Sequence, residues 1–369
     1  MKERPGLHMS GPAEFVAGQP VLAQIAEAAG GTRVFLVGGA VRDALLGIDA
    51  VDLDLVLEAD AIDFAEGLAD EVIGHDRFRT ADFELDGHRI DIATARTEKY
   101  PHPGSLPEVM PASIEADLDR RDFTINAIAV ELRDPKTLID PRGGVDDLQR
   151  GVLRVLHPDS FVDDPTRALR AARYAARFGF DLEPGTSDLL VTADLSTISS
   201  DRVGAELKLI ASEPEAIKAL HLVSNWGLVE IDPERLELLE KAIELGQEGL
   251  WRSLCDRTEL ILEGAFGDFD PDSVGEAPLV PSEGVRRLRD LDDVELLLAR
   301  ATGREWLDQY LSKWANVRLD IDGDDLVRAG ISQGPAVGVG LDAALDARLD
   351  GQADDFDAQL AVALAAARA

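Results

Sequence analysis

Two aspartates separated by one residue, Asp52 and Asp54, lie in the alternating run VDLDLVL. Successive side chains of a strand point to opposite faces, so these carboxylates share one face and the leucines between and after them share the other. Like charges roughly 7 Å apart repel each other, and proteins usually keep such a pair where a cation lies between the two. The pattern predicts a Mg²⁺ site, because Mg²⁺ is commonly shared between carboxylates and phosphate oxygens. The alternative is a half-buried strand whose polar side chains face solvent.

A third carboxylate, Asp91, follows from the same alternation in RIDIATAR, where Ile90 and Ile92 face one way and Asp91 the other. A neighbouring strand could add Asp91 to the first pair. Three such carboxylates can hold two metal ions, which activate an attacking hydroxyl and stabilise a leaving pyrophosphate. We therefore predict Asp52, Asp54 and Asp91 as catalytic residues, with Asp52 and Asp54 as the metal ligands.

A glycine pair, Gly38 and Gly39, lies between a predicted strand and a predicted helix in LVGGAVRDALLG. Because glycine has no side chain, backbone N–H groups can approach a triphosphate there, at the electropositive start of a helix. Arg42, one turn into that helix, could add a charge contact to the phosphates. The alternative for Arg42 is a salt bridge to Asp43. A Gly-Gly pair alone is weak evidence, but beside the carboxylates it indicates a nucleotide site.

Strand-like and helix-like patterns alternate over residues 33–138, which indicates an α+β or α/β domain. The segments FRTADFEL and HRIDIATAR are predicted strands, and the dipeptide Asp86-Gly87 between them suits a tight hairpin turn. After residue 140 helical spacing continues almost to the end, so we place a domain boundary near Arg150. The acidic, Pro- and Gly-containing stretch 264–284 is predicted to be a mobile loop or a second boundary.

The composition is that of a globular chain of 369 residues, long enough for two or more domains, with 71 acidic and 37 basic residues and a net charge of -34. Seven lysines and this acidic excess suggest a cytoplasm of high ionic strength; an ordinary acidic cytosolic protein is the alternative. The single Cys255 excludes an internal disulfide framework and the usual thiolate metal site. No run of about 18 apolar residues is present, so we expect a soluble, cytoplasmic protein.

Five ordered motifs resemble the class II tRNA nucleotidyltransferase (CCA-adding enzyme) and bacterial poly(A) polymerase family. The resemblance covers residues 35–209 and is carried by LVGGAVRDALLG with DLDLV, IDIATARTEKY, LDRRDFTINAIA, DPRGGVDDLQRGVLR and DDPTRALRAARYAARF. It implies an α+β, polymerase-β-like head followed by an all-α neck, body and tail. We assign residues 1–150 to the head, 151–265 to the neck and body, and 266–369 to the tail.

The resemblance also implies roles for particular residues. Asp52 and Asp54 match the carboxylates that bind two Mg²⁺ ions, and Asp91 matches an acid that assists. Asp164 and Arg167 match an acid and an arginine that read the Watson–Crick edge of the incoming base; a helix cap is the alternative for Asp164. For the arginines along the same predicted helix, the alternative is pairing with acids. The nucleotide-binding set is Gly38, Gly39, Arg42, Arg121, Asp122, Asn126, Asp164, Arg167, Arg170 and Arg173.

The family's activity implies that the chain adds C, C and A to the 3′ end of tRNA from CTP and ATP, with Mg²⁺ and without a template. A-only addition, CC-only addition and poly(A) addition use nearly the same residues and stay open. The resemblance implies that those activities differ in a loop between head strands, which residues 97–109 are predicted to contain, and in the body that measures the tRNA. A noncatalytic RNA-binding protein is the alternative from another class. We expect tRNA, CTP and ATP as partners and no membrane, and the oligomeric state is not indicated.

Overall fold

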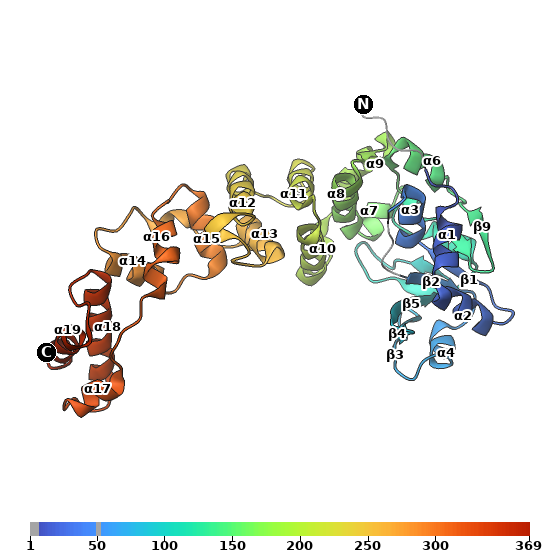
Figure 1. The fold of residues 1–369 in the computed structure, drawn as a ribbon. Helices are drawn as coiled ribbons and strands as arrows, with labels where there is room; N and C mark the ends of the chain where they lie inside the picture. The colour runs from blue at the N-terminus through green and yellow to red at the C-terminus, as the bar shows by residue number, and fades with distance from the viewer. Residues whose placement is uncertain (1–6, 49–52) are drawn as a thin grey trace. The chain divides into compact units, whose positions relative to one another are not determined.

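The computed structural model describes residues 7–48 and 53–369, so the predicted ligand Asp52 lies outside the described residues. The chain forms two compact units that divide between Glu230 and Ile231. Each unit is described by itself below (Figure 1).

The first unit is built on a mixed sheet that has seven strands among the described residues, in the order β3-β4-β5-β2-β1-β8-β9. Strands β2 and β5 pair in parallel, whereas their neighbours pair antiparallel. The strands are β1 (Val34–Val37), β2 (Leu53–Leu57), β3 (Val72–His75), β4 (Thr80–Leu85), β5 (His88–Thr94), β8 (Ala129–Glu131) and β9 (Asp134–Ile139). Two smaller pairs are β6 (Arg96–Lys99) with β7 (Glu108–Pro111), and β10 (Val152–Leu153) with β11 (Asp181–Leu182).

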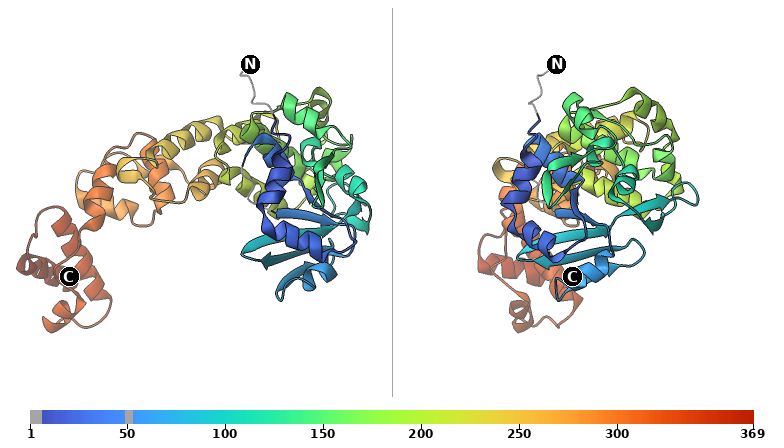
Figure 2. Two further views of the ribbon diagram at one scale, coloured as in Figure 1. Left: turned by 45° about the vertical axis from the view of Figure 1, so that its right-hand side comes forward. Right: turned by 90° about the vertical axis from the view of Figure 1, so that its right-hand side faces the viewer.

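The two faces of this sheet bury different sets of side chains. Leu36 and Leu55 belong to the large core on one face, which also includes residues of helices α1 to α4, and Figure 2 shows α1 and α2 in blue along the sheet. Phe35 and Val56 pack on the other face against Leu118. Asp54 lies between Leu53 and Leu55, so it projects to the second face, as the alternation predicted.

Helices of the first unit surround the sheet and then extend away from it (Figure 1). Ala168, Ala171 and Tyr174 of α8 belong to the same core as the sheet, so α8 is part of the head's packing. The helices are α1 (Gly11–Gly18), α2 (Pro20–Ala28), α3 (Gly39–Leu46), α4 (Ala61–Glu66), α5 (Ile114–Asp119), α6 (Gly144–Arg150), α7 (Ser160–Asp163), α8 (Thr166–Phe178), α9 (Pro184–Leu189), α10 (Ser200–Ser212) and α11 (Ala216–Asn225).

The second unit is helical throughout its described length. A small core at its C-terminal end joins the last three helices through Leu326, Ala344 and Ala363. The helices are α12 (Pro233–Leu245), α13 (Arg257–Phe266), α14 (Pro281–Leu288), α15 (Asp293–Ala301), α16 (Leu307–Ser312), α17 (Gly323–Arg328), α18 (Pro335–Leu349) and α19 (Phe356–Ala367). Across the part of the chain that the structure describes, no helix is long and apolar enough to cross a membrane.

The predicted hairpin is confirmed, because β4 and β5 pair antiparallel across Asp86 and Gly87, whose φ angles are 51° and 78°. These left-handed values suit a two-residue hairpin turn. The predicted α+β head followed by helices is also confirmed. The compact units divide between Glu230 and Ile231, and α8 shares the core of the sheet. The three-part division at 150 and 265 stays a prediction.

Candidate active site

Three carboxylates form a row across neighbouring strands on one face of the sheet. The parallel register places Asp54 of β2 opposite Asp91 of β5, and the antiparallel register places Asp82 of β4 opposite Asp91. Ile90 and Ile92, which flank Asp91, are buried on the opposite face. The predicted approach of Asp91 to Asp54 is therefore confirmed for the backbone. Asp82 extends the row and was missed, although the same alternation in FRTADFEL indicated it.

Electrostatics at this row favour a positive ligand. Burial raises the pKa of Asp91 to about 6, and the neighbouring Asp82 and Asp54 act in the same direction. Arg89 opposes this shift. The Oδ1 atom of Asp91 is buried and accepts no hydrogen bond within the described chain, and Arg89 Nε lies 3.5 Å from it. Repelling carboxylates with an unsatisfied oxygen are the donor set that a hard divalent cation prefers. No three His, Cys, Asp or Glu side chains converge as a metal site in residues 7–48 and 53–369, a range that omits Asp52.

The predicted glycine turn connects β1 to α3 and lies beside this row. Gly38 has φ 66° and ψ −127°, a conformation that other residues rarely adopt, and α3 begins at Gly39. A Cβ atom built on Gly38 would lie 2.9 Å from Arg121 Nη1 and 3.9 Å from Asp54 Oδ2. The backbone of Gly38 therefore passes between an arginine and a carboxylate of the site.

Gly38→Ala is expected to lower the free energy of unfolding by about 1–3 kcal/mol, because alanine is strained at this φ and its methyl group meets Arg121. Chemical denaturation measures the change. The matched control is Gly39→Ala, whose Cβ would meet only Arg42 Nη2 at an ordinary 3.5 Å. Equal stability of the two variants would contradict this account of the turn.

Arg42 is almost fully buried and has two protein partners. Its Nε lies 2.8 Å from Asp43 Oδ1, and its Nη1 donates to Asn126 Oδ1 at 2.6 Å. The ion pair with Asp43, which was the alternative from the sequence, is therefore present. Arg42 also lines the cavity described below, so its predicted contact with phosphates stays a prediction.

A buried acid directly before the motif LDRRDFTINAIA lies behind the two arginines of the motif. Asp117, which is fully buried, bonds to Arg120 at 2.8 Å and to Arg121 at 3.0 Å. Arg120 also pairs with Glu98 of β6 at 2.8 Å. Arg121 keeps a buried Nε that has no hydrogen-bond partner among the described residues. Arg121 lines the cavity described below, where its positive charge is suited to an anionic ligand.

Asp122 connects this motif to α8. Arg170 Nη2 lies 2.7 Å from Asp122 Oδ2, and Asn126 Nδ2 donates to Asp122 Oδ1 at 2.9 Å. Burial alone would raise the pKa of Asp122, but Arg170, Asn126 and Arg167 outweigh burial and lower it to about 2. Asp122 is therefore an anion that fixes Arg170 over the cavity.

The remaining predicted residues come from the start and one face of α8. Asp164 accepts from the backbone N–H and the hydroxyl of Thr166 at 3.1 and 2.7 Å, so the helix-cap alternative holds as well. Arg202 of α10 donates to the same Oδ1 atom at 2.8 Å. Arg173 pairs with Glu213 at 3.3 Å, as the alternative for these arginines anticipated, and its Nε is buried without a partner among the described residues.

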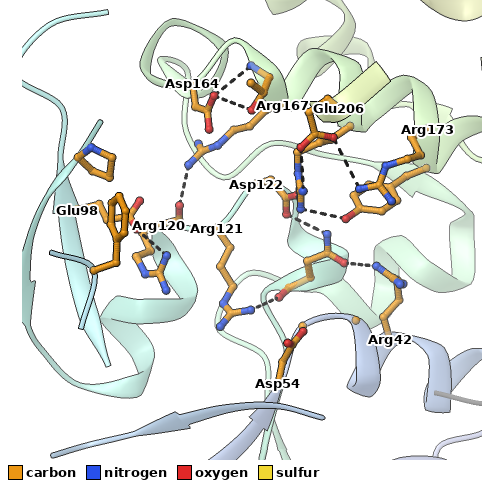
Figure 3. Close-up of a pocket in the computed structure, with 18 of the residues that line it drawn as sticks. Arg42, Asp54, Glu98, Arg120, Arg121, Asp122, Asp164, Arg167, Arg173 and Glu206 are labelled. Carbon is orange, nitrogen blue, oxygen red and sulfur yellow. Dashed lines mark hydrogen bonds and ion pairs between the residues drawn. The ribbon is translucent and has the colours of Figure 1, made fainter. Parts of the chain in front are cut away.

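One cavity of about 840 Å³ joins these side chains (Figure 3). Asp54 and Arg42 lie on one side, Asp164 and Arg167 on the other, and Arg121 with Asp122 between them. Its described lining contains nine arginines and six acids, a local excess of positive charge on a chain of net charge -34. Such focusing attracts anions such as nucleotide phosphates. A smaller cavity of about 260 Å³ shares Asp54, Arg120 and Arg121 and also reaches Asp91.

Several lining residues were missed in the sequence. Glu98 and Tyr100 reach the cavity from β6 and the residue after it. Their positions depend on contacts between elements that are distant in the chain, for which the sequence carries no local signal. Asp117 is different, because its spacing of three and four residues from the two arginines indicates pairing on one helix.

A mixed sheet with a carboxylate row, a glycine turn and an arginine-rich cavity defines a nucleotidyltransferase head of the polymerase-β type. The poly A polymerase head domain family matches residues 34–154. A solved CCA-adding enzyme in its apo form is 31% identical, with a TM-score of 0.79, and the match covers 95% of this chain and 96% of that one. The chain belongs to the class II tRNA nucleotidyltransferase and poly(A) polymerase family, a family of enzymes that generally use divalent metal ions.

The names of the curated relatives state different activities. The A-adding tRNA nucleotidyltransferase of Aquifex aeolicus is 42% identical over 222 residues, which cover 58% of this chain and 27% of that protein. The CC-adding tRNA nucleotidyltransferase of Deinococcus radiodurans is 41% identical over 220 residues, which cover 57% of this chain and 58% of that protein. The chain spans 27 to 47% of the first three curated relatives.

Proposed function

We propose that this chain adds C, C and A to the 3′ end of tRNA from CTP and ATP, without a template and in the cytoplasm. The observation that carries the proposal is a single cavity with Asp54 and the Gly38 turn on one side and Asp164 with Arg167 on the other. That arrangement suits a nucleotide whose triphosphate lies at the sheet and whose base lies at α8. Solved relatives that are 30% and 29% identical are complexes of CCA-adding enzyme with ATP and with CTP.

The triphosphate would lie at the glycine turn. Backbone N–H groups at the start of α3 and the guanidinium of Arg121, which lines the cavity, offer donors to phosphate oxygens. Asp122 keeps Arg170 directed at the same cavity, where its positive charge would face the sugar and phosphates. In this arrangement the α-phosphate would lie near Asp54.

The base would lie against Asp164 and Arg167. Every hydrogen bond that the Asp164 carboxylate accepts from the described residues is made to Oδ1, so Oδ2 is the oxygen left to accept from the exocyclic amine that cytosine and adenine share. Uracil and guanine present a carbonyl oxygen at the corresponding position. Arg167 supplies donors for the ring nitrogen or oxygen. Protein groups would therefore select CTP and ATP without a template.

In the reaction, the 3′ hydroxyl oxygen of the RNA bonds to the α-phosphorus, the bond from that phosphorus to the bridging oxygen of the β-phosphate breaks, and pyrophosphate leaves. Asp91 would assist by taking up the hydroxyl proton. Asp54, with Asp52, would hold Mg²⁺, which when bound supplies positive charge that stabilises the transferring and leaving phosphates. The chain's arginines add charge stabilisation from the opposite side.

Addition of A alone is a second candidate. Curated A-adding enzymes of Aquifex aeolicus and Halalkalibacterium halodurans are 42% and 40% identical over 58% and 51% of this chain. The segment between β6 and β7 bears on this choice, because Tyr100, Leu106 and Pro107 line the cavity. Arg202 connects that segment to the base side by donating to the carbonyl oxygen of Gly104 and to Asp164, each at 2.8 Å.

tRNA as the acceptor is supported by a solved Thermotoga maritima CCA-adding enzyme in complex with tRNA, which is 27% identical with a TM-score of 0.75 over 96% of this chain and 98% of that one. The net charge of -34 does not oppose RNA binding at a local basic site. It implies that binding relies on shape and on a few placed arginines, because nonspecific phosphate affinity falls steeply with salt.

The test is incorporation of labelled CTP and ATP, offered separately and together with Mg²⁺, into tRNA transcripts that end before the tail, after C, and after CC. Ordered addition of C, C and one A is the expected result. Addition of A only to the CC-ended transcript would select the second candidate, and a long A tail would indicate poly(A) synthesis. Absence of incorporation at both low and high KCl would leave a noncatalytic RNA-binding protein.

A further inference from the structure

The guanidinium of Arg167 is surrounded by four acceptors from three separate segments. Nη1 donates to Ser160 Oγ at 2.7 Å and lies 3.4 Å from His157 Nε2. Nη2 donates to the carbonyl oxygen of Arg120 at 2.9 Å and to the Tyr100 hydroxyl at 3.5 Å. Each terminal nitrogen therefore has one short bond, to Ser160 or to Arg120, and one long contact, to His157 or to Tyr100.

The short bonds fix the plane of the side chain. Hydrogen bonds weaken steeply at the long end of their range, so Ser160 and the Arg120 carbonyl carry most of the restraint on Arg167. A base that enters the cavity can replace the two long bonds while the short ones persist. The orientation in which Arg167 meets the base is then determined by the two short bonds.

Ser160 also acts on Asp164. It is fully buried as the first residue of α7, and its carbonyl oxygen accepts from the backbone N–H of Asp164 at 3.2 Å. Its hydroxyl bonds Arg167 at the same time. One residue therefore bonds the guanidinium of Arg167 through its hydroxyl and the backbone N–H of Asp164 through its carbonyl oxygen.

We propose that Ser160 and His157 are positioning residues that orient Arg167 and thereby set base selection. The proposal rests on the proposed function, in which Arg167 contacts the base. Neither residue needs to touch the nucleotide, since both act through the guanidinium. Arginine has a rigid planar fork, so a small rotation moves both of its terminal nitrogens out of line with a base edge.

His157 can accept from Arg167 only as the neutral imidazole. Burial and the adjacent Arg167 lower the pKa of His157, with Arg142 acting in the same direction and Asp163 and Asp159 opposing. The acceptor is therefore present at neutral pH. Protonation at lower pH would remove the lone pair and place a second cation 3.4 Å from Nη1.

Ser160→Ala is the central variant. We expect the KM for CTP and ATP to rise about tenfold to a hundredfold, which corresponds to one lost hydrogen bond to a charged group, with a much smaller change in kcat. Misincorporation of UTP and GTP should increase relative to the wild type. Ser160→Thr keeps the hydroxyl and should retain selectivity. The control is Ser282→Ala, a buried serine of the second unit whose hydroxyl bonds Asp350.

The pH profile separates a positioning role from a merely structural one. In the wild type, the KM for CTP should rise as the pH falls through the lowered pKa of His157, below its ordinary value. Asparagine is not protonated in this pH range, so the KM of His157→Asn for CTP should not rise as the pH falls. Ser160→Cys is a second variant in case the alanine variant unfolds. Cysteine has nearly the volume of serine but is a poor hydrogen-bond acceptor. Calorimetry without tRNA measures the nucleotide binding of this variant.

Two failures can be told apart. A wild type that incorporates no nucleotide overturns the proposed function, and the calorimetric Kd values for CTP and UTP still test whether Ser160 controls base preference. An active wild type whose Ser160→Ala and Ser160→Cys variants keep the KM, the selectivity and the Kd within about twofold, a difference below 0.5 kcal/mol, overturns the positioning role.

Discussion

Replacing Asp54 with asparagine is expected to reduce nucleotide incorporation at least about a thousandfold, since a metal-binding carboxylate supplies several kcal/mol of charge stabilisation and each 1.4 kcal/mol is worth tenfold in rate. Asparagine has nearly the same shape, so the change removes one negative charge from the row. Asp54 lies in register with Asp91 and contributes to the raised pKa of Asp91. Loss of that repulsion should leave the free energy of unfolding unchanged or slightly higher.

The measurement is single-turnover incorporation of ATP into CC-ended tRNA, together with tRNA binding and chemical denaturation. Glu84→Gln is the matched control. Glu84 is an exposed acid of β4, so its substitution removes one negative charge from the same sheet away from the cavity. We expect that control to keep activity within about twofold, as is usual for surface substitutions. Retention of more than a tenth of wild-type activity by Asp54→Asn would contradict the catalytic role of the carboxylate row.

The carboxylate row shows what local sequence patterns can predict. Alternation of period two identifies the face on which Asp54 and Asp91 lie, because each is flanked by buried apolar residues. The pairing of β2 with β5 is not local, since about thirty residues and another hairpin separate them. Strand order and register emerge only when the two faces of the sheet are packed. The sequence therefore identifies Asp54 and Asp91. The structure shows that they lie in register and that Asp82 lies beside them.

The arginines show where local patterns stop. Their number on α8 indicates a basic face, and the structure pairs Arg170 with Asp122 and Arg173 with Glu213. A buried guanidinium requires an anion, but which anion it meets depends on how helices cross. Asp164 shows that two interpretations of one residue can both hold, because it caps α8 through Oδ1 and lines the cavity as well. The spacing of residues in the sequence alone predicts neither the partners of these arginines nor the two roles of Asp164.

Asp122→Asn has the largest expected effect on stability. Asp122 is buried and lies 2.7 Å from Arg170, so the variant leaves the half-buried guanidinium of Arg170 with Glu206 at 3.5 Å as its remaining acid and the Tyr174 hydroxyl at 3.0 Å. Removing one partner of a buried ion pair costs about 3–5 kcal/mol, which chemical denaturation of the full chain would detect. The control is Asp119→Asn, which breaks an exposed pair with Arg142 and should cost about 1 kcal/mol or less.

The sign of the pH dependence gives a second measurement of the same pair. The pKa of Asp122 is lowered in the folded chain to about 2 from a usual 3.8, so its contribution is fully present above about pH 5 and is lost as the pH falls towards 2. The stability difference between the wild type and Asp122→Asn should therefore shrink over that range, whereas the difference for Asp119→Asn stays small throughout. A difference for Asp122→Asn that does not change between pH 5 and 2 would show that the stabilisation comes from packing rather than from the charge of Asp122.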